Sequence, residues 1–199
     1  MSDLHTEAPA TRRAQPRETR RTIGRWTVSF AGYPLGGYAA FLLTGRVDSP
    51  GPALAGGLLT GAILGAIQVW AIGQARPRAL AWILATAVGL MAGVAVGAAL
   101  VDYQTDLGSL VVQGAVGGAL VGIAQAVVLM PRLGALAFVW PPFLSATFAI
   151  GWAVTTSAGI DVDQQFTIFG SSGALVATLL TAVLPLVMNS RHDTEERAS

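Results

Sequence analysis

Six long apolar stretches separated by short polar ones dominate the pattern of the chain. They run over about 26–44, 52–73, 79–101, 107–130, 135–158 and 167–188, and none contains Asp, Glu, Lys, Arg or His. Each is near the ~20 residues that a helix needs to cross the ~30 Å hydrocarbon core of a bilayer. The pattern predicts an all-α integral membrane domain over 26–188 with six transmembrane helices. Because the loops are short, consecutive helices should be antiparallel neighbours.

Two polar segments flank this domain. Residues 1–25 are almost free of apolar side chains and carry six arginines, a composition that cannot bury enough apolar surface to fold. They are predicted to form a disordered cytoplasmic tail. Residues 189–199 are predicted to form a second, shorter cytoplasmic tail.

Composition agrees with the membrane interpretation and removes several kinds of chemistry. Of the 199 residues, 53% are hydrophobic and only 12% are charged, which is too apolar for an ordinary soluble domain. Cysteine is absent, and the two histidines, His5 and His192, fall in the polar tails. We therefore expect no catalytic thiolate, no metal site and no cofactor. The net charge of +1 gives no reason to expect nucleic acid as a partner.

The arginines predict the orientation, since basic loops stay on the cytoplasmic side. Eleven of the twelve fall in the two tails and in the second and fourth loops, and only Arg46 falls on the other side. The opposite loops carry Asp48, Asp102, Asp106, Asp161 and Asp163. Both termini are therefore predicted to be cytoplasmic in the cell membrane. Near the arginine-bearing ends lie four tryptophans that would suit an interfacial aromatic belt: Trp26, Trp70, Trp82 and Trp140.

An internal repeat of about 56 residues connects the apolar stretches. Residues 61–72 match 118–129 at an offset of 57, and 173–184 match the second of these at an offset of 55. Residues 79–83 match 135–139 at an offset of 56, which pairs Trp82 with Phe138. The pattern predicts three parallel helical hairpins with pseudo-threefold symmetry about the membrane normal. Their bounds are about 26–73, 79–130 and 135–188.

Small residues recur at helical spacing within these repeats and predict close helix packing. The glycines concerned are Gly57, Gly61, Gly65, Gly89, Gly93, Gly97, Gly114, Gly118 and Gly122. Gln68 and Gln125 follow two of these stripes on the same helix face, and an amide facing hydrocarbon needs partners. Together with Gln113 and Thr181 they are candidates for interhelical hydrogen bonding or for a polar lining. Leu180 replaces the amide in the third copy, so a ring of amides would be incomplete.

The two Gly-x-x-x-Gly-x-x-Gln copies, at 61–68 and 118–125, resemble a loose group of uncharacterised multi-pass bacterial membrane proteins. In that group Gly-x-x-x-Gly-x-x-Gln-Trp recurs, whereas Val69 and Ala126 stand at the tryptophan position here. The resemblance implies a multi-pass membrane fold and brings no activity with it. In size and helix count the chain is also similar to the substrate-binding components of energy-coupling-factor vitamin transporters.

A Gly-x-Ser-Gly motif at 170–173 resembles the nucleophile motif of rhomboid intramembrane serine proteases. A serine nucleophile needs a base, but the apolar stretches hold no histidine and the chain holds no lysine. His192 lies twenty residues beyond Ser172, which is ~30 Å along a helix. We therefore predict that the protein is not an enzyme, and that Ser171 and Ser172 satisfy backbone groups in the first turn of the last helix.

These features favour a non-enzymatic membrane protein whose packed helical body is an assembly or accessory component. Its expected partners are the lipid bilayer and either another membrane protein or a second copy of the chain. The alternative is a small channel, facilitator or solute-binding component for a neutral or apolar molecule. Ion-coupled transport is disfavoured, because it normally uses ionisable groups at membrane depth.

Overall fold

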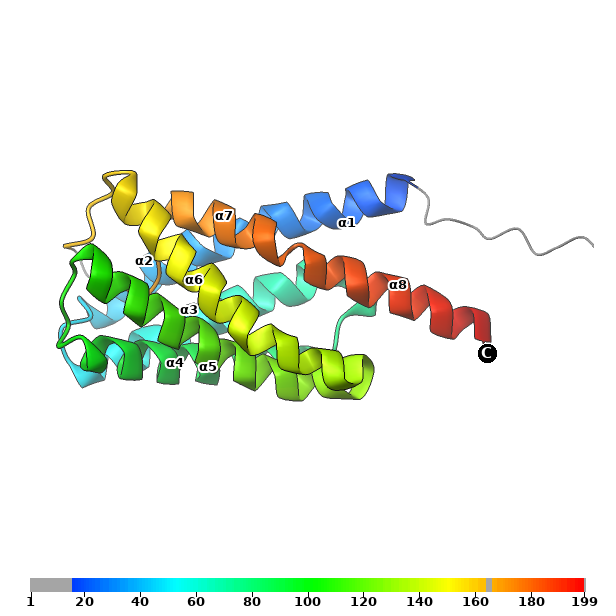
Figure 1. Ribbon diagram of the computed structural model, residues 1–199, viewed down its shortest axis with the longest axis horizontal. Coiled ribbons are helices and arrows are strands. Elements are labelled where there is room, and N and C mark those ends of the chain that lie inside the picture. The colour runs from blue at the N-terminus through cyan, green and yellow to red at the C-terminus, as the bar shows by residue number, and fades with distance from the viewer. Residues whose placement is uncertain (1–15, 164–165, 199) are drawn as a thin grey trace, which may run out of the picture.

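The protein is entirely helical in the part of the chain that the structure describes, residues 16–163 and 166–198. A computed structural model shows the arrangement (Figure 1). The elements are, in order, α1 (Pro16–Val28), η1 (Ser29–Ala31), α2 (Gly32–Thr44), α3 (Pro50–Ile72), η2 (Gly73–Ala75), α4 (Ala79–Leu100), α5 (Leu107–Leu133), η3 (Gly134–Val139), α6 (Trp140–Ser157), α7 (Ser171–Thr181) and α8 (Val183–Ala198).

Four helical stretches are long and apolar enough to cross a membrane. They are Pro50–Ile72, Ala79–Leu100, Leu107–Ser157 and Ser171–Ser190. The third stretch contains α5 and α6, which turn back on each other at η3 and pack along their length. The all-α membrane class predicted from the sequence is therefore confirmed.

The helices run back and forth between the two ends of one bundle (Figure 1). The turns after α3 and α5 lie at the same end as the start of α1 and the end of α8, and the turns after α2, α4 and α6 lie at the other. Neighbouring pairs along the chain, α3 with α4, α4 with α5 and α5 with α6, form the most extensive contacts. The described chain ends therefore lie at the arginine-bearing end of the bundle.

Prolines explain the break between α1 and α2, which form the first rod of the bundle, and the break between α7 and α8, which form the last rod. A helical proline lacks the N–H for the carbonyl four residues earlier, and its ring also crowds that carbonyl. Pro34 is four residues beyond Phe30, in the 3₁₀ turn that separates α1 from α2. Pro185 is four residues beyond Thr181, where α7 ends. By contrast, Pro141 and Pro142 lie in the first turn of α6, where a proline is tolerated.

The ends of the apolar domain differ from the predicted tails. Residues 16–25 are helical and form most of α1, and the chain stays helical to Ala198. Contacts that are distant in sequence account for this: Asn189 donates to Thr22 Oγ1 at 3.1 Å, and the Arg25 guanidinium lies 5.0 Å from the Trp70 ring centre. Residues 1–15 of the predicted N-terminal tail lie outside the described residues.

Arginines at this end also hydrogen-bond to carbonyls where helices finish. Arg25 donates to the carbonyl oxygen of Trp70, and Arg132 donates to that of Ala75 at 2.5 Å. The carbonyls of a helix's last turn have no partner within the helix, and a cation there is favoured by the helix dipole. The arginines thus have a packing role besides any effect on orientation.

The predicted glycine stripes lie at three consecutive interfaces. A methyl group placed on Gly61 of α3 would lie 2.6 Å from the Thr86 carbonyl oxygen of α4, and one on Gly118 of α5 would lie 2.1 Å from the Leu144 carbonyl oxygen of α6. Gly93 of α4 approaches the backbone of α5 in the same way. Only glycine allows backbones to come this close, and close packing drives helix association in lipid.

Candidate functional site

Buried tryptophan N–H groups meet polar acceptors between helices in the middle of the bundle. Trp82, near the start of α4, donates from Nε1 to Gln68 Oε1 of α3 at 3.1 Å. Trp140, the first residue of α6, donates in the same way to Gln125 Oε1 of α5 at 2.8 Å. In each pair the tryptophan lies on the helix after the one that carries the glutamine. It follows the glutamine by 14 residues in the first pair and by 15 in the second.

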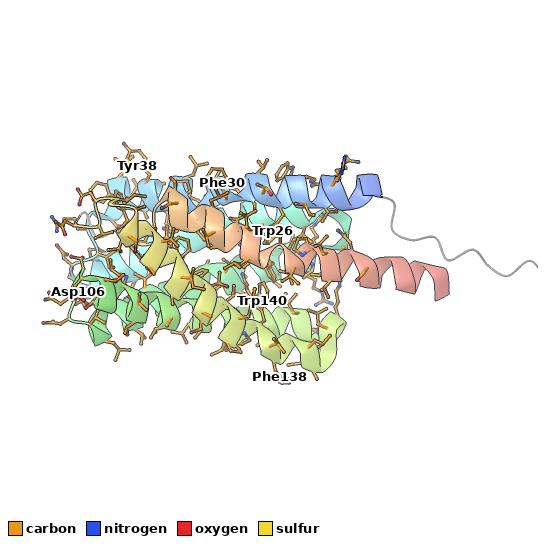
Figure 2. All side chains as sticks on the ribbon, turned by 45° about the horizontal axis from the view of Figure 1, so that its top comes forward. Trp26, Phe30, Tyr38, Asp106, Phe138 and Trp140 are labelled. Carbon is orange, nitrogen blue, oxygen red and sulfur yellow. The ribbon has the colours of Figure 1, made fainter. Side chains whose placement is uncertain are left out.

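A third pair links the two ends of the chain. Trp26 of α1 donates from Nε1 to Thr181 Oγ1 of α7 at 3.3 Å and to the Thr178 carbonyl oxygen at 3.0 Å. We call these residues the tryptophan cluster, defined as Trp26, Trp82 and Trp140 with the acceptors Gln68, Gln125 and Thr181. Figure 2 shows Trp26 and Trp140 within the body of the bundle, whereas Tyr38 and Asp106 lie near one end.

The break between α7 and α8 supplies the acceptor that the missing third glutamine would have provided. In an unbroken helix the Thr178 carbonyl would accept from the N–H of Ala182. Here the Ala182 N–H bonds to Leu179 O at 3.3 Å instead, which leaves the Thr178 carbonyl for Trp26. The sequence predicted an incomplete ring at this position, because that prediction considered side-chain amides and no backbone carbonyl.

Gln125 uses both ends of its amide. Its Nε2 donates to Thr86 Oγ1 of α4 at 2.9 Å, and Thr86 in turn donates to the Trp82 carbonyl oxygen at 2.9 Å. A single side chain therefore connects α4, α5 and α6. Gln113, the other glutamine of α5, is buried beside Gly97, twelve residues or ~18 Å along the helix from Gln125. The structure does not bring it into the cluster.

The six cluster residues surround a void of only about 10 Å³. Its remaining walls are apolar or aromatic, formed by Tyr33, Leu64, Val121, Leu144 and Phe148. A cavity needs ~10–15 Å³ on this measure to hold one water molecule. The middle of the bundle is thus filled by side chains at the level of the cluster.

Burial of the cluster corrects two interpretations of the tryptophans. Trp26, Trp82 and Trp140 are 2%, 0% and 8% exposed and act as internal donors, so only Trp70, at 52%, has the exposure of an interfacial residue. The sequence match that pairs Trp82 with Phe138 is shifted by two residues. Phe138 is exposed at the outside of the bundle (Figure 2), and Trp140 occupies the position that corresponds to Trp82.

Ser172 does not have the environment of a nucleophile or of a helix cap. Its hydroxyl oxygen is buried and has no hydrogen-bond partner among the described residues. Gly170 caps α7 without any side-chain hydrogen bond, so the predicted capping by Ser171 and Ser172 is wrong. His192 belongs to α8, beyond the break in the helix. Within 16–163 and 166–198, no three His, Cys, Asp or Glu side chains form a group suited to a metal ion.

A larger cavity of about 400 Å³ lies away from this centre, at the end opposite the chain termini. Its walls come from α2, from the end of α6, from residues 160–162 and 166–170 and from the start of α7. Aromatic and branched aliphatic side chains dominate them. No residue pattern predicted this cavity, because the connection that forms it has no recognisable motif.

The comparisons with known proteins give no relative. No protein-family model, no curated protein and no solved structure matches the chain. The function of the protein is therefore inferred from the tryptophan cluster, the glycine interfaces and the cavity.

Proposed function

We propose that the chain is a non-enzymatic multi-pass membrane protein whose helical body is packed shut and serves as an assembly or accessory component of the cell membrane. The observation that supports this is the filled centre of the bundle. A channel or facilitator needs a polar path, but here the polar side chains of the cluster bond to one another around a void of about 10 Å³.

The body crosses the membrane six times in this proposal, by α1 with α2, α3, α4, α5, α6, and α7 with the first part of α8. The reversal at η3 divides one apolar stretch into two crossings, and the first rod has a buried face formed by residues such as Trp26 and Tyr33. We infer that this end is cytoplasmic, because it carries the arginines and holds both described chain ends, and the positive-inside rule favours arginines on that side.

The three hairpins are related by rotation about the bundle axis in this proposal. Each cluster hydrogen bond joins the second helix of one hairpin to the first helix of the next: Gln68 to Trp82, then Gln125 to Trp140. The bond from Trp26 to Thr181 joins the third hairpin back to the first. Three equivalent links that close on themselves are what a threefold arrangement requires.

The outside of the bundle offers lipid and partners a uniformly apolar surface. Small residues lie at the internal interfaces, whereas large side chains such as Leu42, Leu43 and Val127 are 64%, 76% and 68% exposed. The surface contacts the bilayer and a membrane partner or a second copy. Binding energy in such a protein comes from packing of its faces, since no Asp, Glu, Lys, Arg or His lies in the apolar stretches.

Cysteine labelling tests the closed body in this cysteine-free chain. Single cysteines at 68, 125 and 181, in the cluster, are compared with one at the exposed Asp161. A membrane-impermeant thiol reagent should label Asp161→Cys and leave the three cluster positions protected from either side of the membrane. Labelling of the cluster positions at the rate of Asp161→Cys would contradict the proposal.

A second candidate function is the binding of an apolar molecule, and the cavity of about 400 Å³ favours it. Ligand sites in proteins are typically clefts of ~300–1,000 Å³ lined mainly by hydrophobic and aromatic side chains. This function does not need a path through the centre, so it is compatible with the packed body.

A further inference from the structure

The close packing of the bundle is interrupted between its first and last rods. Glycines bring backbones together from α3 to α6, and Gly36 does the same between α2 and α3. Between α2 and α7 the contacts are sparse. Among the described residues, a methyl group placed on the α2 glycine that faces this side, Gly37, would lie 3.0 Å from the side chain of Ile168 rather than close to a helix backbone. The α2–α7 seam is therefore the weak side of the bundle.

Aromatic residues from the connection between α6 and α7 bridge this seam. Phe166 packs against Phe41 of α2 with ring centres 4.9 Å apart, and Phe169 stacks on Tyr33 at 5.2 Å. Phe169 also meets Trp152 of α6 edge to face. Rigid rings in several orientations do not fill the space between them completely, and the cavity of about 400 Å³ is located here.

The walls of the cavity suit a hydrocarbon and do not suit a polar solute. The apolar side chains of the lining include Tyr38, Trp152, Ile160, Val162, Phe166 and Ile168. The Thr155 hydroxyl already donates to the Gly151 carbonyl oxygen at 2.9 Å. Among the described residues that line the cavity, Asp161 alone is charged; it is exposed and accepts the Asp163 N–H at 2.9 Å. The remaining hydroxyls of the lining are those of Tyr33, Tyr38 and Ser171, so a molecule with many polar groups would bury most of them without partners, at a cost of ~1–3 kcal/mol for each.

The opening of the cavity adjoins the surface that faces the bilayer. Leu35 and Tyr38, which line the cavity, are 59% and 60% exposed on α2. One to two turns further along the same helix, Leu42 and Leu43 are also exposed. In a membrane this surface is in contact with acyl chains, so hydrocarbon is the molecule present at the entrance.

We propose that the α2–α7 seam cavity binds one acyl chain of a membrane phospholipid, which enters sideways past Leu35 and Tyr38. The inference rests on the membrane-embedded body proposed above and does not depend on its closed centre. Transfer of the chain into the cavity covers lining side chains that still have exposed surface, such as Tyr38 and Ile160 at 60% and 37%. A void without partner atoms also forfeits the dispersion contacts of its lining. The bound chain completes the side of the bundle that glycine packing leaves open.

Photo-crosslinking from the acyl chain tests this proposal on the full chain in liposomes. The probe is a phosphatidylcholine with a diazirine in the middle of one chain, and peptide mass spectrometry locates the adducts. We expect adducts on Trp152 and Phe169, which are 4% and 1% exposed and cannot be reached by lipid that only surrounds the bundle. Adducts confined to outward side chains such as Leu43 and Val127 would overturn the proposal.

A variant in which a larger side chain fills the cavity provides the matched comparison. Val162→Phe enlarges a cavity-lining side chain, and Val96→Phe makes the same change on the exposed face of α4. Labelling of Trp152 and Phe169 should fall severalfold in Val162→Phe and stay unchanged in Val96→Phe. Equal labelling in both variants would contradict the assignment of the cavity.

A fluorescence measurement keeps the test independent of whether Val162→Phe folds. Phosphatidylcholine brominated in mid-chain quenches tryptophans that its chains approach. The unsubstituted chain should lose more emission in brominated than in ordinary lipid, and Trp152→Phe should remove a large share of that difference. If Trp152→Phe leaves the quenched emission unchanged, no chain occupies the cavity. The cysteine labelling of the cluster would be unaffected by that outcome, so the two proposals fail separately.

Discussion

Trp140 donates its indole N–H to Gln125 Oε1 at 2.8 Å, between the consecutive helices α5 and α6. Gln125 is 2% exposed and also donates to Thr86 at 2.9 Å, so its amide is satisfied at both ends. A buried amide without partners would be costly in hydrocarbon. The pair therefore fixes the relative positions of α5 and α6 and fills the bundle axis at the same time.

Replacement of Gln125 by leucine tests this role. The change removes the acceptor of Trp140 and the donor to Thr86, and each buried group left unpaired costs about 1–3 kcal/mol. We expect the free energy of unfolding, measured by SDS titration in mixed micelles, to fall by at least that amount. Gln113→Leu is the control on the same helix outside the cluster and should cost clearly less. Equal losses in the two variants would contradict the assigned role of Gln125.

Adjacent glycines on α5 test the packing of the helices. Gly118→Ala places a methyl group 2.1 Å from the Leu144 carbonyl oxygen and should destabilise the bundle by about 1–3 kcal/mol through overpacking. A methyl group on Gly117 meets nothing nearer than Phe148 at 3.9 Å, so Gly117→Ala should be neutral or stabilising by up to ~1 kcal/mol from helix propensity. The same SDS titration measures both, and equal effects would rule out the close α5–α6 contact.

Residue patterns predicted the membrane class and the helix faces that carry the close contacts, but not the register of the tryptophan cluster. The four-residue spacing of Gly114, Gly118 and Gly122 was sufficient, because small residues on one helix face have few other uses in lipid. Trp140 was harder to place. The sequence match at 79–83 and 135–139 pointed to Phe138, and only the 3₁₀ turn of η3 shifts the donor by two residues.

The third cluster bond and the seam cavity depend on backbone geometry that composition does not reveal. The Thr178 carbonyl becomes an acceptor because the helix stops four residues before Pro185. The polar side chains of the sequence do not indicate a backbone acceptor at this position. The cavity forms because the connection after α6 crosses back over α2 through Phe166 and Phe169. Proline spacing was the available signal for the first, and none was available for the second.

Asp106 gives a prediction for the start of α5 as pH falls. Hydrogen bonds from the Ser109 hydroxyl and backbone N–H lower the pKa of this exposed carboxyl below its usual value. A lowered folded-state pKa means that the stabilisation is present above the unfolded-state pKa and is lost as pH falls through the folded-state value. We expect hydrogen-exchange protection of the 109–111 amides to drop only in that acidic range. Asp106→Ala should lack the protection at neutral pH as well, and a pH-independent protection would contradict the cap.

The orientation of the bundle is testable with single cysteines at its two ends. Asp48→Cys and Gln104→Cys lie at one end, and Arg78→Cys and Ala135→Cys lie at the other; all four positions are exposed. An impermeant thiol reagent added to intact cells should label the first two, and the second two only after the membrane is opened. The reverse result would place both termini outside.

Solute flux into proteoliposomes tests the closed centre most directly. Vesicles that contain the purified protein are mixed with hyperosmotic glycerol or urea in a stopped-flow instrument, and light scattering follows their shrinkage and re-swelling. Because the void at the centre of the bundle is only about 10 Å³, we predict that re-swelling is as slow as in protein-free vesicles of the same lipid. Faster re-swelling that is abolished by Val121→Trp, which enlarges a residue lining that void, would show a path through the bundle and contradict the packed body.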